Sequence, residues 1–537
     1  MIVSNNYKYK YKVYKTHHKR FTPPFYGKFF SLDNDSLNQS FIKQDKEAFI
    51  ECCYKHLDEK KTSVFFYVEY IESSFKSNAF KDAYLLILSK HKMFLNTFYD
   101  LAMTYSFEKA LHKTFEHLNK HDIDVQFNDL NFTFTKQGSV FIIALKKAYL
   151  EYISQHTKVP IIVAARNFFQ EGFVEIDKNI AAWYITNEDV LEADMNLLYD
   201  QAIIYNIPLI FSKNHPIPFS SGDILGYYHK KDMFVLNPNE HTMREIALET
   251  ESRNAFIETK NSYGKKNTKV VFGVSKLSDI TDEFIMNHTD IIYVLLERFL
   301  YKFHTNPNVF ETLMIKVSES KYKKIIIKLP HLRTEFVDGT IRMTDLEGLE
   351  ENQYNKNIDL YEPIFKAMKH LMNKDVYVAI PFIRDEGEFV WHRRDIEAFL
   401  QALNIRVNKI GTLLQTDSLS DKVSSINRHN QFDFAIIDSN ELFQEVYDTT
   451  RFSYFEYFEY IKHLYQEIRT LHENLNTRKY EQYFHGYLLS QPKLAKKMFN
   501  SGIKNIIIYR SQAYNFYKSL PKNKIESSLI NKNDRIK

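Results

Sequence analysis

The chain has 537 residues, of which 44% are hydrophobic, and its formal net charge is only +4. This length exceeds what one hydrophobic core normally organises, so two or three domains are expected. The scattered lysines form no basic stripe of the kind that binds nucleic acid. No apolar run approaches 18 residues and no signal-peptide core is visible, so the sequence predicts a soluble, cytoplasmic protein without membrane spans.

Cysteine and glycine usage narrows the range of chemistry. The two cysteines, Cys52 and Cys53, are adjacent, which excludes a disulfide framework and suits a reducing compartment. Only 13 glycines occur, several-fold fewer than average usage of roughly 7% would give. Neither G-x-G-x-x-G nor G-x-x-x-x-G-K is present, so a glycine-rich phosphate loop is not expected.

The first half of the chain divides by its periodicity. Residues 1–30 contain a short strand followed by a Pro-Pro turn, and residues 31–152 are helical in pattern. Strands recur over 153–242, with one helical segment at 190–205, which predicts a small α/β domain completed by residues 1–30. The charged stretch 243–267 predicts a linker helix and a domain boundary.

Residues 268–520 alternate short apolar runs with amphipathic helices, and residues 521–537 form a tail. Eight strand candidates over about 250 residues make a (β/α)8 barrel the simplest closed arrangement. The candidate strands are 270–274, 291–296, 324–329, 376–381, 409–414, 432–437, 483–489 and 505–510.

Barrels of this kind carry their active groups on the loops that follow the strands. Lys, Arg, Asn, Glu and His in such loops predict a site for an anionic substrate and for a hard cation such as Mg2+, bound through Glu441. The alternative is that these polar side chains simply face water. The candidates are Ser275, Glu297, Arg298, Lys328, Gln415, Asn440, Glu441, Arg451, His485, Arg510 and Ser511.

The order of these parts, and several segments, resemble enzyme I of the phosphoenolpyruvate-dependent sugar phosphotransferase system. The stretch IGTLLQTD followed by FDFAIIDSNELFQ and an Arg looks like the metal- and substrate-binding segments of that family. Asn440 and Arg451 match substrate-binding positions. Gln415 and Glu441 stand at the two metal-ligand positions, so weakened Mg2+ binding is implied.

Other segments match less fully. The resemblance places Lys328 at a phosphate-binding Arg position, Leu296 at a second one with Arg298 two residues on, and His485 at the general-acid Cys position. It also places Leu197 where the family has its phosphate-accepting His. A shuttle without that His cannot carry phosphate.

The resemblance implies a phosphohistidine-type α/β domain over 1–30 and 153–242, a phosphocarrier-docking helical subdomain over 31–152 and a phosphoenolpyruvate-binding barrel that dimerises. It suggests a degenerate paralogue that binds phosphoenolpyruvate or another small anion in a regulatory or docking role. The alternative is an active phosphoenolpyruvate-utilising transferase in which Glu441 and Asn440 hold a divalent cation and His485 acts as acid or base. A chain that merely forms a dimer, with itself or with a true enzyme I, is the third reading.

Overall fold

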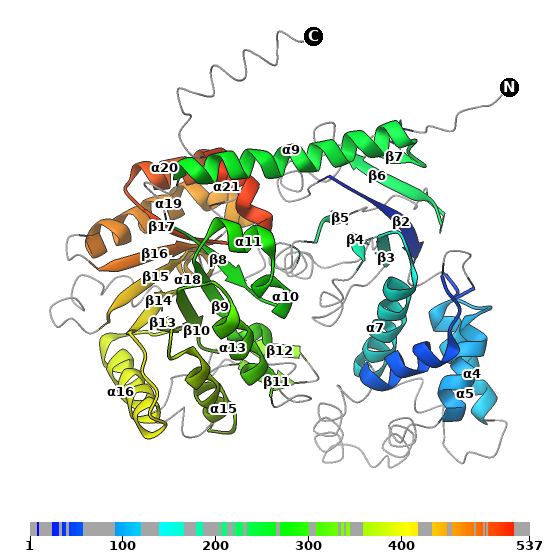
Figure 1. The fold of residues 1–537 in the computed structure, drawn as a ribbon, viewed down its shortest axis with the longest axis horizontal. Helices are drawn as coiled ribbons and strands as arrows, with labels where there is room; N and C mark the ends of the chain where they lie inside the picture. The colour runs from blue at the N-terminus through cyan, green and yellow to red at the C-terminus, as the bar shows by residue number, and fades with distance from the viewer. Residues whose placement is uncertain are drawn as a thin grey trace, which may run out of the picture.

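The carboxyl-terminal half of the chain forms a closed barrel of eight parallel strands (Figure 1). In this computed structural model, the described residues are 8–9, 24–31, 35–38, 42–56, 92–119, 139–165, 179–185, 202, 207–211, 219–220, 222–228, 233–264, 269–299, 308–330, 334–337, 340–343, 358–416, 432–447, 454–476, 480–486, 489 and 492–519.

The barrel strands are the eight that the sequence predicts, and each pairs in parallel with its two neighbours around the ring. Their interiors are buried runs rich in Ile and Val, as expected of strands covered on both faces. The predicted (β/α)8 barrel is therefore confirmed. In ring order the strands are β10 (Lys324–Lys328), β13 (Asp375–Ile380), β14 (Lys409–Leu414), β15 (Phe434–Asp438), β16 (Glu481–His485), β17 (Asn505–Ile508), β8 (Lys269–Val274) and β9 (Ile291–Leu295).

Helices follow the strands in sequence and bury apolar side chains in the protein core. In α13, for example, Phe310, Leu313 and Val317 are buried at helical spacing. The helices of this half are α10 (Leu277–Ile280), α11 (Glu283–His288), η1 (Leu296–Phe299), α13 (Val309–Glu319), α15 (Ile358–Met368), η2 (Lys369–Leu371), α16 (Glu386–Ala402), α18 (Ser439–Tyr447), α19 (Tyr454–Asn476), α20 (Pro492–Asn500), η5 (Arg510–Gln512) and α21 (Ala513–Ser519).

The barrel half also contains a hairpin that the sequence did not reveal. Between β10 and α15, β11 (Thr334–Val337) pairs antiparallel with β12 (Thr340–Met343). Each strand has only four residues, too few for alternation to give a clear signal. The hairpin follows the strand that ends at Lys328.

A mixed seven-stranded sheet forms the second α/β unit. Strands β2 to β5 run parallel, and β6, β7 and β1 continue the sheet antiparallel. The predicted helix at 190–205 lies almost wholly outside the described residues, and nothing in this sheet shows a phosphohistidine domain. The strands are β1 (Lys8–Tyr9), β2 (Phe25–Ser31), β3 (Ile161–Ala165), β4 (Ile180–Ile185), β5 (Leu209–Phe211), β6 (Ile224–Tyr228) and β7 (Met233–Leu236).

A helical part with an aromatic core adjoins that sheet. Phe49 is fully buried, and its ring centroid lies 5.3 Å from that of Tyr152 and 6.2 Å from that of Tyr149. Cys52 and Cys53 are buried free thiols. Burial raises the pKa of Cys52 to about 11, which suits a packing role rather than a redox role. The helices are 46–56, α4 (Lys92–Ala102), α5 (Phe107–Asn119) and α7 (Ser139–His156).

The long helix α9 (Glu240–Gly264) joins the two halves, where the sequence predicts a linker helix. Figure 1 shows it running from the barrel to the sheet. It contacts α21 on the barrel and β2 and β6 of the sheet. The Arg253 guanidinium lies 4.2 Å from the centre of the Tyr514 ring, a cation–π contact that fixes the helix to α21.

Within the described part of the chain, no helix combines the length and apolar character needed to cross a membrane. The longest, α9 and α19, carry charged residues along their whole length. The cytoplasmic location stays a prediction.

An ionic network centred on Glu481 fills the amino-terminal end of the barrel interior. The carboxylate accepts hydrogen bonds from Lys324 Nζ at 3.1 Å, Lys409 Nζ at 2.5 Å, Tyr377 Oη at 3.0 Å and Tyr483 Oη at 2.7 Å. Burial acts to raise the pKa of Glu481, but the hydrogen bonds and the lysine charges outweigh it and lower the pKa to about 2. The carboxylate therefore stays ionised and balances two lysines.

The substitution Glu481→Gln should destabilise the protein, because it removes the counter-ion of Lys409 and leaves Lys324 only its longer contact with Asp375, at 3.7 Å. We expect a loss of roughly 2–4 kcal/mol in the free energy of unfolding, measured by urea denaturation at pH 7. The wild-type pKa is depressed, so this contribution is complete above pH 4.5 and is lost as the pH falls toward about 2.

Glu473→Gln is the matched control. Glu473 pairs with Arg469 four residues earlier on α19, where both side chains are more than half exposed. Its loss should cost no more than about 0.5 kcal/mol. Equal losses in the two variants would contradict a stabilising role for the Glu481 network.

Candidate active site at the carboxyl ends of the barrel strands

Several predicted site residues meet where the barrel strands end. Lys328 is the last residue of β10 and His485 the last of β16, while Gln415 follows β14 directly. Asp438 ends β15 and is the register partner of His485. Parallel strands bring their carboxyl ends to one face of a barrel, which explains the convergence.

Asp438 and His485 form a buried pair at the centre of this face. Their side chains approach to 3.3 Å between Oδ2 and Nδ1, and the residues are 4% and 6% exposed. The Asn440 N–H donates to Asp438 Oδ1 at 3.2 Å. Burial acts to raise the pKa of Asp438, but the nearby charges of His485 and Lys328 and the hydrogen bonds lower it below its ordinary value. Asp438 is therefore a carboxylate.

Neither ring nitrogen of His485 makes a regular hydrogen bond among the described residues. Nδ1 makes the ion-pair contact with Asp438, whereas Nε2 is buried with no polar partner. Tyr293 and Tyr509 flank the imidazole, with ring centroids 5.8 and 5.6 Å away. A buried imidazole that faces a carboxylate with one nitrogen and leaves the other unsatisfied is arranged to exchange a proton.

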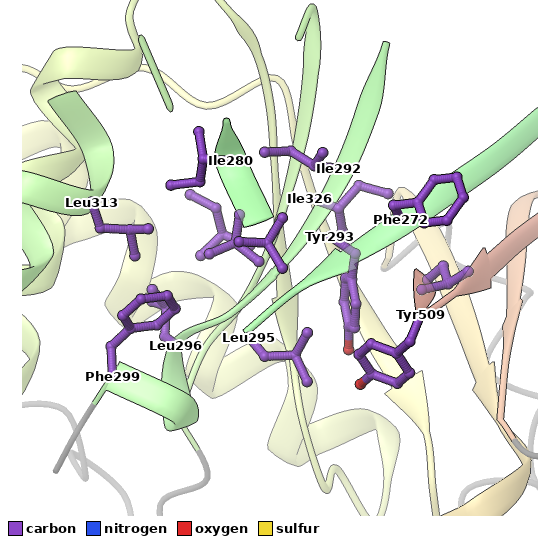
Figure 2. Packing of buried hydrophobic residues seen from close by; sticks show 14 of the residues in the cluster. Phe272, Ile280, Ile292, Tyr293, Leu295, Leu296, Phe299, Leu313, Ile326 and Tyr509 are labelled. Carbon is purple, nitrogen blue, oxygen red and sulfur yellow. The ribbon is translucent and has the colours of Figure 1, made fainter. Parts of the chain in front are cut away.

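Tyr293 supplies a second unsatisfied group. It stands in the middle of β9, is fully buried, and its hydroxyl has no hydrogen-bond partner among the described residues. Burial first, and then the negative charges of Asp438, Glu297 and Glu441, raise its pKa well above the ordinary value. The hydroxyl therefore keeps its proton and is available as a hydrogen-bond donor. Figure 2 shows the Tyr293 and Tyr509 rings side by side with their hydroxyls directed the same way.

Lys328 provides a buried positive charge. Its Nζ donates to Glu297 Oε2 at 3.0 Å, and its side chain is 7% exposed. Glu297 lies on η1, directly after β9, so the pair joins the ends of two adjacent strands. The charge of Lys328 also acts on Asp438.

The predicted metal ligands, Gln415 and Glu441, are both buried here. Gln415 Nε2 donates to Asp438 Oδ2 at 3.1 Å, and its Oε1 accepts from the Phe382 N–H at 3.1 Å. Gln415 thus positions Asp438. Among the described residues no group of three or more His, Cys, Asp or Glu side chains is arranged to hold a metal ion. Glu297 pairs with Lys328, and Asp438 already accepts from Gln415 Nε2 and the Asn440 N–H, which leaves few carboxylate oxygens for a divalent ion.

Of the other residues that the sequence predicts for the site, some lie near it and others lie outside the described part of the chain. Asn440 and Glu441 lie in the first turn of α18, and Arg298 is half-buried on η1 next to Glu297. Arg451 and Leu197 lie outside the described residues.

Sequence reasoning missed Asp438 and Tyr293 as site residues. Asp438 directly follows the apolar run FDFAII, and a carboxylate in that position was a usable signal. Tyr293 sits inside the run IIYVL, where nothing distinguishes it from a core aromatic residue.

Comparison with known proteins gives little at the level of sequence. No family model matches the chain. A curated relative, reticulocyte-binding protein homolog 1 of Plasmodium falciparum, is 23% identical over 267 residues, which is 46% of this chain. The chain spans only 8% of that protein's length.

Solved structures with similar barrels cover about half of the chain. Protein CitE of Mycobacterium tuberculosis, in complex with magnesium and pyruvate, is 8% identical, with 49% of this chain and 95% of that one covered and a TM-score of 0.31. An HpcH/HpaI aldolase/citrate lyase family protein of Burkholderia cenocepacia is 10% identical, with 51% and 99% covered and a TM-score of 0.31. Malate synthase of Haloferax volcanii, as a pyruvate/acetyl-CoA ternary complex, is 7% identical, with 49% and 75% covered and a TM-score of 0.34. These values are too low to assign an activity.

The predicted relationship to enzyme I is wrong. The similar solved barrels are aldolase, citrate lyase and malate synthase proteins, and no family model supports the relationship. The misleading segments are buried strands followed by polar residues, which every parallel barrel produces. Phosphotransfer, sugar transport and both phosphoenolpyruvate-dependent functions are therefore dropped. Magnesium is bound in the solved CitE complex, and weak Mg2+ binding by this chain stays a prediction. The phosphocarrier partner and the homodimer stay predictions.

Gly486, which follows His485, should not tolerate a side chain. Its φ is +135°, and a Cβ there would lie 1.8 Å from Ser439 Oγ and 3.0 Å from Asn440 Oδ1. We expect Gly486→Ala to lower the free energy of unfolding by at least about 2 kcal/mol, in a urea titration, because backbone strain and a clash add.

Gly222→Ala separates these two effects. Gly222 also has a positive φ, +94°, but a Cβ there would meet nothing within 4 Å. Its substitution should cost only the backbone strain, about 1 kcal/mol. If both variants lose the same stability, the tight contact between Gly486 and Ser439 is not real.

Proposed function

We propose that this protein is an enzyme that moves a proton on a small carbonyl or carboxylate compound at the carboxyl-terminal face of its barrel. The observation that carries the proposal is the buried His485, whose Nδ1 faces Asp438 at 3.3 Å and whose Nε2 has no partner among the described residues. A carboxylate on one nitrogen fixes the tautomer and leaves a lone pair on the other.

In this proposal Nδ1 of His485 keeps its proton, which is directed at the Asp438 carboxylate, and Asp438 stays ionised. Nε2 then takes a proton from the carbon next to the carbonyl group of the substrate, and the electron pair of that C–H bond moves onto the carbonyl oxygen as an enolate. Asp438 stabilises the imidazolium that forms. His485 later returns the proton to the same carbon or to another atom of the enolate, which restores the imidazole.

Two buried groups suit the negative charge on the enolate oxygen. Lys328 is a cation held in place by Glu297, and the Tyr293 hydroxyl is a donor that keeps its proton. Preorganised donors and charges in a water-poor site stabilise such an oxygen strongly. Every step in this sequence uses a side chain of the protein.

Proton exchange with solvent tests the proposal without knowledge of the complete reaction. The protein is incubated in D2O with pyruvate, 2-oxobutyrate and oxaloacetate, and loss of the C–H signal is followed by proton NMR. Wild-type protein should exchange the hydrogens of at least one compound faster than buffer does. His485→Gln should slow this exchange by at least about 100-fold, because it removes the base.

His463→Gln on α19 is the matched control, since His463 is exposed. It should exchange like wild type, and thermal unfolding should show that His485→Gln remains folded. If wild-type protein gives no exchange with any of the three compounds, or if folded His485→Gln exchanges at the wild-type rate, the proposal is wrong.

A further inference from the structure

A separate cleft lies on the opposite face of the barrel, where the strands begin. It has a volume of about 830 Å³ and is bordered by the first residues of β8, β9, β10 and β13, by the end of α11 and by the two residues that connect α11 to β9. Volumes of this size hold small molecules in other proteins. This face of a (β/α)8 barrel normally serves stability, so an open cleft lined by several lysines needs another explanation.

The cleft carries an excess of positive charge. Four lysines line it against two aspartates, Asp290 and Asp375. Two of the lysines are engaged: Lys324 Nζ donates to Tyr377 and Glu481, and Lys321 Nζ donates to Asn287 Oδ1 at 3.2 Å. The other two are Lys269 and Lys323.

Lys269 and Lys323 are exposed, and their ammonium groups have no partner among the described side chains. Lys269 begins β8, and Lys323 comes immediately before β10. Since β9 lies between β8 and β10 in the ring, the two lysines flank the Thr289–Asp290 turn. Two strand spacings put their backbones about 10 Å apart. Lysine side chains are long enough to reach one small anion from backbones this far apart.

We propose that this cleft binds a small phosphorylated ligand that also carries hydroxyl groups. Lys269 and Lys323 would take the phosphate oxygens by charge-assisted hydrogen bonds. The carboxylate of Asp290, which lies between them and has no side-chain partner among the described residues, would accept hydrogen bonds from the hydroxyl groups. This ligand site is independent of the function proposed for the opposite face.

The aspartates also decide against a nucleic acid. A phosphate backbone needs a continuous basic track, whereas Asp290 and Asp375 interrupt the lysines of this cleft.

Isothermal titration calorimetry on the full chain, with pyrophosphate and ribose 5-phosphate as probes, tests this inference. Both probes should bind wild-type protein, and binding should weaken with added salt. The double variant Lys269→Ala/Lys323→Ala should bind each probe at least about tenfold more weakly. Lys493→Ala/Lys496→Ala on α20 removes two exposed charges elsewhere and should bind like wild type.

Asp290→Asn distinguishes the two parts of the ligand. It should weaken binding of ribose 5-phosphate while leaving or improving binding of pyrophosphate, which has no hydroxyl group to donate. His485→Gln should leave both probes bound, because His485 lies at the other end of the barrel. The inference is overturned if neither probe binds at millimolar concentration, or if the Lys269/Lys323 double variant binds as tightly as wild type. It fails for hydroxylated ligands if Asp290→Asn weakens only pyrophosphate.

Discussion

Closing eight parallel strands into a ring pairs each strand on both sides and removes the open edges of the sheet. That closure also forces the inward side chains of all eight strands into one narrow space. Apolar residues fill the middle of the barrel interior, and the charged side chains lie near its two ends. The register between β15 and β16 then places Asp438 directly beside His485. The chemistry proposed for the carboxyl-terminal face of the barrel depends on this closure more than on any single loop.

The two ends of the barrel treat a buried carboxylate differently. Glu481, at the amino-terminal end, accepts hydrogen bonds from two lysines and two tyrosines. Its charge therefore has a structural role in the barrel interior. Asp438, at the carboxyl-terminal end, is also contacted by several donors. Its neighbour His485, however, has a buried Nε2 without a hydrogen-bond partner among the described residues. A buried polar group without a partner costs stability. Of the two carboxylate networks, only the one around Asp438 contains a ring with unsatisfied nitrogens.

The sequence was sufficient to predict the barrel fold, but it was insufficient to identify the protein family. Runs such as KIGTLL and FDFAII are apolar, short and regularly spaced, and burial on both faces leaves them little other use. The end of a strand is also readable, so Lys328 and His485 were found. Neither Tyr293, concealed in an apolar run, nor the pairing of Asp438 with His485 is local, because both depend on how distant strands meet. Gln415 was interpreted through a family pattern as a metal ligand, whereas its amide spans Asp438 and the Phe382 N–H. The same local patterns misled the family assignment, since strand-then-polar segments belong to all such barrels.

The helix α9 has a consequence for how the chain can change over evolutionary time. It is 25 residues long, about 37 Å at 1.5 Å per residue, and it contacts both the sheet and α21. Inserting or deleting one residue between these contacts would rotate the sheet by about 100° relative to the barrel. The length of α9 is therefore free to drift only in steps of about a whole turn. Loops elsewhere can lengthen one residue at a time, whereas the length of α9 is constrained by the rotation that each helical residue adds.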